Sequence, residues 1–338
     1  MPAEWAPHAA TWTAWPYDDE KWLGYLEPVR QEFAAFVNTL ARFESVNLVV
    51  NDEESEADAK ARLSGGNISF YRIPHNDSWL RDSGAIFVKK NGSVAPVKWE
   101  FNGWGGKYPA DLDNHMPQHM ARILGAKLFN AGIVMEGGSL EVNGQGICIT
   151  TRQCLLSPKR NPGLNEEDLE TYLRDYLAID NVIWLGDGLE GDHTDGHVDT
   201  ITRFTGESTI VTAVCEDESD PNHRTLQDNW EILESLGAFR IVRLPLPKNP
   251  LWLDQETRLP LTYANFYIAN GAVLVPTYGD PNDARALEIL RPLFPGREMI
   301  GLSSRALITG GGSFHCVTQQ QPEGILFQQP AGEVWRGE

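Results

Sequence analysis

Residues 136–149 read EGGSLEVNGQGICI, and this stretch decides the fold because it describes a β-hairpin that recurs along the chain. Asn143-Gly144 stands between alternating apolar residues. Asn-Gly in that setting is the strongest short-range hairpin signal, because both turn residues need a positive φ. Similar runs begin near residues 82, 196, 263 and 310, about fifty to seventy residues apart. This spacing indicates repeated supersecondary units.

Helical patterns and short apolar strands alternate with the hairpins. Apolar residues at three-four spacing predict helices over 26–42, 112–124, 166–178, 224–236 and 283–294. Short strands are expected after them, over 46–50, 127–130, 181–185, 239–244 and 298–302. The last hairpin shows one clear strand near 310–317, and residues 11–15 are expected to supply its partner. The pattern predicts a single α/β domain over 1–338, closed as a five-unit propeller without exposed sheet edges.

The composition of the chain restricts the kinds of partner that it can bind. The chain has 338 residues and a net charge of -19, which opposes binding to nucleic acid and to anionic membranes and would attract a small cation. No apolar run reaches the length of a membrane span. The N-terminal residues do not resemble a secretion signal, and the four cysteines form no CxxC, so we expect a cytoplasmic protein without a disulfide scaffold. A homodimer is a further expectation.

The reactive residues gather at the hairpin starts. In a ring of repeats, equivalent positions converge on the axis, so one pocket is expected to collect Asp82, Glu136, His197, Asp199 and Cys316. A cysteine thiolate is a strong nucleophile, and histidine exchanges protons near neutral pH. Carboxylates suit a planar guanidinium, whose charge would also favour the thiolate. The set indicates nucleophilic attack on the central carbon of a guanidinium group.

Six motifs resemble those of the agmatine deiminase / bacterial peptidylarginine deiminase family, in the right order over essentially the whole chain. They are Trp15-Pro16, NDSWLRD over 76–82, FNGWGGKY over 101–108, EGG over 136–138, GHVD over 196–199 and GGGSFHC over 310–316. The resemblance implies the pentein fold, with five ββαβ units around a pseudo-fivefold axis. It also implies hydrolysis of agmatine, a small cationic guanidine, to N-carbamoylputrescine and ammonia, without a metal or organic cofactor.

The resemblance also implies residue roles. Cys316 is expected to be the nucleophile and His197 the general acid and base. Asp82 and Asp199 are expected to hold the guanidinium nitrogens, with Glu136 beside them supporting His197 or the guanidinium. The substrate chain is expected to contact Trp79 and Gly312.

Two positions depart from the agmatine branch of the family. His193 stands four residues before His197, where an acidic residue is common, and Asp195 replaces an asparagine. Both leave the guanidinium chemistry unchanged and bear on how the distal amine of agmatine is held. A serine, Ser313, also stands where asparagine is common.

Several residues also have structural interpretations. Cys148, Cys154 and Cys215 are expected to be structural, and so is His315, whose side chain should point to the opposite face of a strand. Asp77 and Arg81 are either a buried pair or catalytic, and Trp104 either packs or contacts substrate. His193 and His197 match the pattern HxxxH, which binds zinc when it lies on a helix. The glycine between them argues against a helical zinc site.

Other functions remain open at this stage. A related enzyme would act on peptidyl-arginine or on free arginine, whose carboxylate Arg203 or Arg243 would hold. An amidinotransferase would pass the carbon to an amine instead of water. A ribosome-binding pentein is the non-enzymatic alternative, which the sequence pI of about 4.8 and the complete nucleophile set disfavour.

Overall fold

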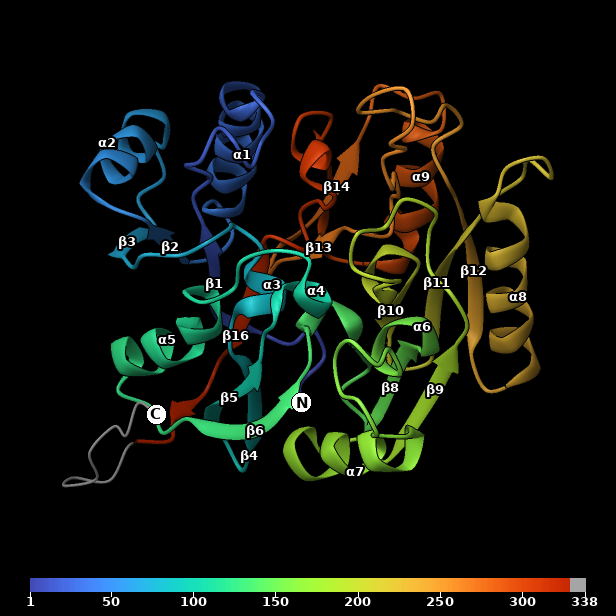
Figure 1. Ribbon diagram of the computed structural model, residues 1–338, viewed down its shortest axis with the longest axis horizontal. Coiled ribbons are helices and arrows are strands. Elements are labelled where there is room, and N and C mark those ends of the chain that lie inside the picture. Colours follow the sequence, from blue (N-terminus) through green and yellow to red (C-terminus); the bar gives the residue numbers. More distant parts are fainter. Residues whose placement is uncertain (329–338) are drawn as a thin grey trace.

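The computed structural model describes residues 1–328, which form five small sheets around a central axis (Figure 1). The sheets follow one another around this axis in chain order, and the first and last long strands meet in one sheet. This arrangement confirms the predicted α/β ring of five units.

Each sheet contains an antiparallel hairpin and a third strand that runs parallel to the second hairpin strand. A helix on the outside connects the second strand to the third. The hairpins and third strands are β4 (Ile86–Lys90), β5 (Ser93–Glu100) and β6 (Phe129–Val134); β7 (Glu141–Val142), β8 (Ile147–Thr151) and β9 (Asn181–Leu185); β10 (Thr202–Gly206), β11 (Thr209–Val214) and β12 (Arg240–Pro245); β13 (Tyr267–Ile268), β14 (Ala272–Thr277) and β15 (Glu298–Ser303); and β16 (Thr318–Pro322), β1 (His8–Ala14) and β2 (Val46–Val50).

The fifth sheet closes the ring. β1 pairs antiparallel with β16, with Thr11 opposite Gln320, and parallel with β2, with Thr11 opposite Val46. The predicted partner strand at the N-terminus is therefore confirmed. β1 is therefore hydrogen-bonded on both sides where the two ends of the ring meet. The expected absence of sheet edges is wrong, because the five sheets are separate and this one has β16 and β3 (Ile68–Arg72) as its edges.

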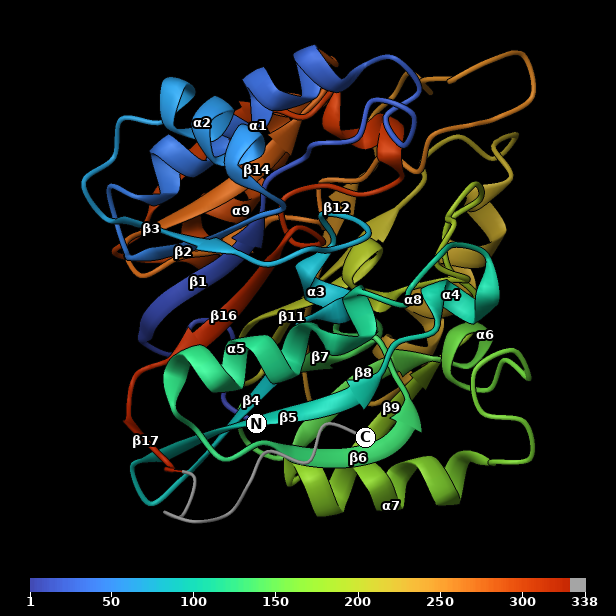
Figure 2. The ribbon, with the colours of Figure 1, turned by 60° about the vertical axis from the view of Figure 1, so that its left-hand side comes forward.

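The helices lie outside the ring and bury their apolar faces against the sheets (Figures 1 and 2). They follow the predicted pattern as α1 (Leu26–Leu40), α5 (Met116–Leu124), α7 (Glu166–Leu177), α8 (Asn222–Ser235) and α9 (Asp283–Leu290). In α7 the buried residues are Leu169, Leu173 and Leu177, and Asn165 with Asp168 forms a capping box that satisfies backbone donors at the helix start.

The predicted hairpin starts differ from the structure. Residues expected to begin strands lie in single turns just before them: α3 (Leu80–Ser83), η2 (Gly137–Ser139), η3 (Val198–Thr200) and, before β16, η5 (Leu307–Gly310) with the turn that follows. Near the axis each segment meets the equivalent segment of another unit instead of a partner strand. A Cβ at Gly137, for example, would lie 2.2 Å from the carbonyl oxygen of Arg81.

The elements that were not predicted include one helix and one strand that follow β2. α2 (Glu53–Arg62) and β3 (Ile68–Arg72) extend the β1 sheet beyond β2. The α2 sequence EESEADAKAR buries only Ser55 and Ala59, so it carries no apolar period from which a helix could be recognised.

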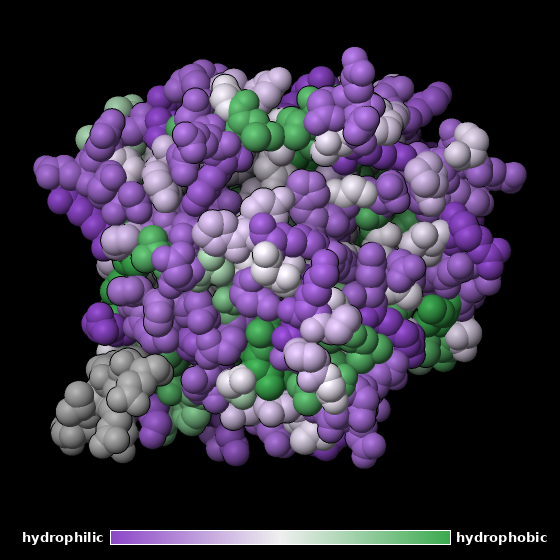
Figure 3. Space-filling view, viewed as in Figure 1, coloured by the Kyte–Doolittle hydropathy of each residue, from purple (hydrophilic) through white to green (hydrophobic). Residues whose placement is uncertain are grey.

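The prediction of one domain over 1–338 includes residues 329–338, which lie outside the described part of the chain. Within residues 1–328, no helix is both long and apolar enough to cross a bilayer. Hydrophilic side chains cover most of the face seen in Figure 3.

Candidate active site

A cavity of about 280 Å³ lies where the turns before the strands converge. Four of the predicted site residues line it, namely Trp79, Asp82, Gly312 and Cys316. The other lining residues are Glu20, Lys21, Trp22, Leu23, Asp77, Trp104, Tyr108, Pro109, His193, Thr194, Leu253, Thr309, Gly310 and Gly311. The predicted residues His197, Asp199 and Glu136 are buried behind this lining.

Cys316 lies in the turn between η5 and β16 and is almost fully buried. Its Sγ is 3.6 Å from Asp199 Oδ2 and accepts a hydrogen bond of 3.1 Å from Asn265 Nδ2. A Cβ at Gly312 would lie 3.1 Å from Sγ and 2.7 Å from the Trp79 ring. The glycine therefore allows the backbone to approach the thiol closely.

Asn265 is a site residue that sequence reasoning missed. It precedes β13, in the one repeat unit from which no reactive residue was chosen. Its side-chain oxygen accepts from the backbone N–H groups of His315 and Cys316, at 3.2 and 3.3 Å. Asn265 therefore fixes the turn that carries the thiol and donates to the thiol itself. Its position in the repeat was the available signal.

Asp82 occupies the last turn of α3, at the pocket floor. Its Oδ2 accepts from Trp104 Nε1 at 2.9 Å and its Oδ1 from the backbone N–H of Gly138 at 2.9 Å. Trp104 thus both lines the cavity and holds a site carboxylate, so its two proposed roles coexist. Burial, followed by the charge of Asp199, raises the pKa of Asp82 well above its ordinary value.

His197 and Asp199 lie at the start of η3. The backbone bends there through Asp195 and Gly196, with φ of 63° and 85°. Aspartate tolerates the left-handed conformation nearly as well as asparagine, which explains why Asp195 can replace the asparagine common in the family. His197 Nδ1 lies 3.6 Å from Asp82 Oδ1, and neither ring nitrogen has a hydrogen-bond partner within residues 1–328. Burial lowers the pKa of His197 to about 3, so the resting imidazole is neutral.

Glu136 lies one layer behind the pocket. Both of its oxygens accept from Arg160 Nε, at 3.0 and 3.1 Å, and both side chains are buried. Sequence reasoning also missed Arg160, whose Nη1 donates a hydrogen bond of 2.7 Å to Asp195 Oδ2. Because Glu136 is occupied by this ion pair, the geometry favours support of His197 from behind over direct contact with the guanidinium.

His315 does not point to an opposite strand face, as the sequence analysis expected. Residue 315 lies in the turn before β16, where strand alternation does not apply. Its Nδ1 lies 2.6 Å from Asp199 Oδ2. Burial raises the pKa of Asp199, but the hydrogen bond and charge of His315, with smaller contributions from His197 and Arg203, together hold it below its ordinary value.

The proposed Asp77–Arg81 pair is wrong. Asp77 lines the cavity and accepts from the backbone N–H of Ser78, and burial raises its pKa. Arg81 points away from the cavity to Glu4, Gln319 and Gln320. The two side chains leave α3 and its preceding loop on different sides.

The cations proposed to hold a substrate carboxylate are also misplaced. Arg203 is fully buried against Glu141 and Glu4, and Arg243 packs over the Trp230 ring, 4.3 Å from its centroid. Neither belongs to the cavity lining. His193 does line it, with Nδ1 3.0 Å from the Tyr108 hydroxyl.

A single buried group among the described residues has donor atoms close enough to hold a metal ion, formed by Glu136, Cys154 and His197. It does not include His193, so the HxxxH spacing does not form the group. The Arg160 guanidinium already bonds both oxygens of Glu136, and a cation in that position opposes a second one. Cys154 and Cys148 are buried free thiols, and Cys215 is a half-buried one.

The Cys316 thiol is protonated in the resting site. Burial, followed by the charges of Asp199 and Asp82, raises its pKa well above the ordinary value. The thiol and Asp82 therefore face the cavity, with Asp199 and the neutral imidazole of His197 directly behind them. A planar cation entering the cavity would stabilise the thiolate and both carboxylates together.

Comparison with known proteins agrees with this site. The family model described as Porphyromonas-type peptidyl-arginine deiminase matches residues 1–322. The chain belongs to this family. A putative agmatine deiminase from Legionella pneumophila is 39% identical, over 96% of this chain and 94% of that one. The agmatine deiminase of Pseudomonas aeruginosa is 38% identical, over 95% of both.

Solved structures of family members have the same fold. A cysteine-to-serine variant of C. jejuni agmatine deiminase with substrate bound superposes with a TM-score of 0.90, at 34% identity over 96% of each chain. A putative arginine deiminase from Porphyromonas gingivalis superposes with a TM-score of 0.88, at 38% identity over 96% and 98%. The protein is a pentein hydrolase that acts on carbon–nitrogen bonds of linear amidines.

Proposed function

We propose that the protein is an agmatine deiminase that converts agmatine and water to N-carbamoylputrescine and ammonia. One observation carries the proposal: the Cys316 thiol opens into a pocket whose floor presents Asp82, with Asp199 3.6 Å from the sulfur. Carboxylates this close to the sulfur can bind the nitrogen atoms of a guanidinium whose carbon faces the sulfur. The names of the relatives at 38–39% identity support agmatine as the guanidine.

The reaction proceeds in two halves. The positive charge of the guanidinium stabilises the thiolate form of Cys316. The thiol proton passes to His197 as sulfur forms a bond to the guanidinium carbon. His197 then protonates one terminal nitrogen, the carbon–nitrogen bond breaks, and ammonia leaves a thiouronium on Cys316. Water adds to the same carbon and gives a proton to His197. The carbon–sulfur bond breaks, and the hydroxyl proton of the adduct passes to sulfur, which restores the Cys316 thiol and releases the ureido product. His197 gives its proton to solvent, where the ammonia released in the first half takes it up as ammonium.

The distal amine of agmatine would lie among the outer residues of the cavity. Glu20 and Asp77 supply carboxylates there, while His193 and Lys21 oppose a second positive charge. Agmatine is therefore expected to be preferred by a modest margin over arginine and by a larger margin over peptidyl-arginine.

We also propose that the enzyme acts in the cytoplasm as a homodimer. Its cysteines are free thiols, as is usual in a reducing compartment. Exposed aromatic side chains such as Tyr25, Phe129 and Trp252 offer area for a second copy. Cell fractionation and light scattering of the purified protein test the two statements.

Ammonia release from agmatine, arginine and a peptidyl-arginine substrate tests the function. The highest kcat/KM is expected for agmatine, with no turnover by Cys316→Ala and normal turnover by the control Cys215→Ala. A wild-type enzyme that prefers arginine or a peptide would overturn the substrate, and an active Cys316→Ala would overturn the chemistry.

A further inference from the structure

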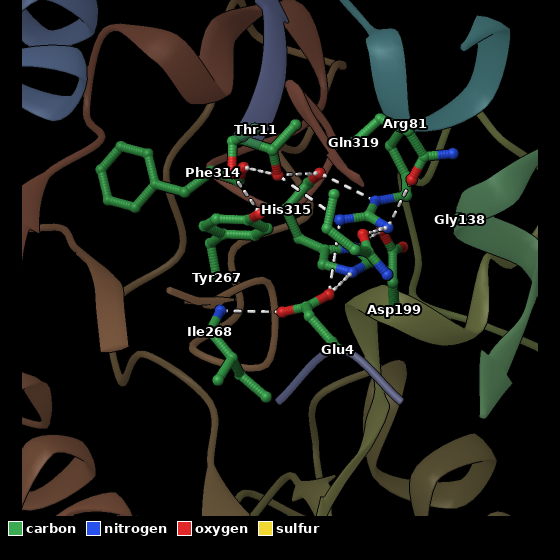
Figure 4. Close-up of polar contacts among 12 residues, drawn as sticks. Glu4, Thr11, Arg81, Gly138, Asp199, Tyr267, Ile268, Phe314, His315 and Gln319 are labelled. Atoms are coloured by element: carbon green, nitrogen blue, oxygen red, sulfur yellow. Dashed lines mark hydrogen bonds and ion pairs between the residues drawn. The ribbon is translucent and has the colours of Figure 1, made fainter. Parts of the chain in front are cut away.

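Behind the pocket floor, three buried side chains connect the N-terminal segment to the site (Figure 4). His315 Nδ1 lies 2.6 Å from Asp199 Oδ2, and its Nε2 lies 2.7 Å from Glu4 Oε2. The exposed fractions of the three residues are 0% for Asp199, 2% for His315 and 5% for Glu4. None of the three belongs to the cavity lining, so the chain Glu4–His315–Asp199 is a layer beneath it.

Both ring nitrogens of His315 face carboxylate oxygens. An ionised carboxylate only accepts hydrogen bonds, so the ring donates to both carboxylates at once only as an imidazolium, which carries a proton on each nitrogen. Glu4 is ionised as well, because Arg203, His315 and Arg81 outweigh its burial and hold its pKa well below the ordinary value. The imidazolium is therefore held between two negative charges in a site closed to water.

The two oxygens of Asp199 have different surroundings. Oδ2 contacts His315 and lies nearest the Cys316 sulfur. Oδ1 is buried and has no hydrogen-bond partner in the described part of the chain. A buried carboxylate oxygen without a partner is costly unless a ligand satisfies it. The His315 contact fixes the rotation of the carboxylate and leaves Oδ1 available to a guanidinium nitrogen.

Glu4 is itself rigidly held. Its Oε1 accepts from the backbone N–H of Ile268 at 2.8 Å and from Arg203 Nη2 at 3.0 Å. Arg203 is fixed in turn by Glu141 at 2.7 Å, and Arg81 Nη2 lies 3.4 Å from Glu4 Oε2. Segments of several repeat units thus converge on one carboxylate of the N-terminal segment. This is more organisation than closing the ring requires.

We propose that His315 is a positioning residue for the deiminase reaction, held by Glu4, and that it keeps Asp199 ionised and turned toward the substrate cation. The proposal rests on the proposed function, in which Asp199 binds a guanidinium. It gives the N-terminal segment a part in catalysis although that segment does not reach the pocket.

The first test compares Glu4→Gln and His315→Gln with a matched pair elsewhere. His8 and Glu44 form a second buried histidine–carboxylate pair, 3.2 Å apart, that does not contact Asp199. His8 is left unchanged because its Nε2 lies 2.6 Å from the backbone oxygen of Glu4. Glu44→Gln therefore reproduces the loss of a buried pair and should keep kcat/KM within about threefold of wild type. Glu4→Gln and His315→Gln should each lower kcat/KM at least about tenfold, the effect of one charge-assisted contact. Because Glu4 acts through His315, the double variant should lose little more kcat/KM than either single variant.

The pH profile separates positioning from a purely structural role. Losing the His315 charge raises the pKa of Asp199, so the acidic limb of kcat/KM should move to higher pH in His315→Gln. The other charged groups near His315, namely Arg81, Arg203 and Glu141, and the neutral His197 remain in all of these variants. Glu44→Gln should keep the wild-type limb.

The second test does not depend on which guanidine is the substrate. Chloroacetamidine, a planar cation, and neutral iodoacetamide both alkylate a thiol, and their rates at Cys316 are compared. Wild type should favour the cationic reagent, while Glu4→Gln and His315→Gln should lose most of that preference and keep the iodoacetamide rate. A folded Glu4→Gln that retains the full preference and the acidic limb overturns the proposal, even if His315→Gln fails to fold. A wild type without any preference overturns cation binding by Asp199, and with it the proposed function.

Discussion

Gly138 is the position where the smallest change should do the most damage. A Cβ there would lie 2.6 Å from His197 Nδ1, 2.8 Å from Asp82 Oδ1 and 3.1 Å from Asp199 Oδ2. Ordinary contacts of this kind begin near 3.4 Å, so Gly138→Ala forces His197 to move by about 0.8 Å and Asp82 by about 0.6 Å. A misplacement of roughly 1 Å at a reacting centre costs about a hundredfold in rate.

The expected result is a folded enzyme with kcat/KM for ammonia release lowered about a hundredfold, and a stability loss of about 1–3 kcal/mol from overpacking. Gly66→Ala is the control, since no atom lies within 4 Å of its added Cβ and the residue is exposed. Thermal unfolding of both variants reports on the fold. A folded Gly138→Ala with kcat/KM within about threefold of wild type would refute the claim that these three side chains surround the reacting group.

Four other perturbations test separate parts of the account. Asn265→Ala removes a donor to sulfur, so thiol alkylation should need higher pH and kcat should fall about tenfold or more; an unchanged alkylation profile would contradict this. Agmatine binding to Cys316→Ala should release protons, because a bound cation opposes the rise in the pKa of Asp82. Calorimetry in two buffers measures this proton release. The release should be absent when Asp82→Asn is combined with Cys316→Ala. His193→Glu should lower KM for agmatine, whereas an unchanged or higher value would place the amine elsewhere. Dialysis against EDTA should leave activity intact, and activity restored by zinc would contradict a metal-free mechanism.

The periodic features of the fold could be predicted from the sequence. Asn143-Gly144 and the alternating strands around it predicted the hairpin, and its recurrence predicted the ring. The expected turn geometry is wrong, because Gly144 has a positive φ but Asn143 does not, and the turn extends to Gly146, which also has a positive φ. Helix α7 was predictable because its apolar residues share one face. Helix α2 was not recognised because its charged sequence buries only Ser55 and Ala59; the capping box of Asp52 and Ser55 was the available signal.

The site could be predicted only where residue type and repeat position coincide. Cys316 and Asp82 lie at equivalent hairpin starts and do line one cavity. Asn265 shares that repeat position but carries no reactive group, and Arg160 lies outside the repeat pattern. The place of His315 was mispredicted because strand alternation was applied to a turn. Contacts of this kind depend on three-dimensional convergence that no local pattern encodes.

The most direct measurement of the central claim is an acid quench of the working enzyme, followed by mass analysis of the peptide that carries Cys316. During turnover of agmatine, the account predicts an N-alkylthiouronium on Cys316, heavier than the free thiol by agmatine less ammonia, that decays as substrate is consumed. An unmodified Cys316 throughout turnover, together with an adduct on another residue or turnover by Cys316→Ala, would contradict it.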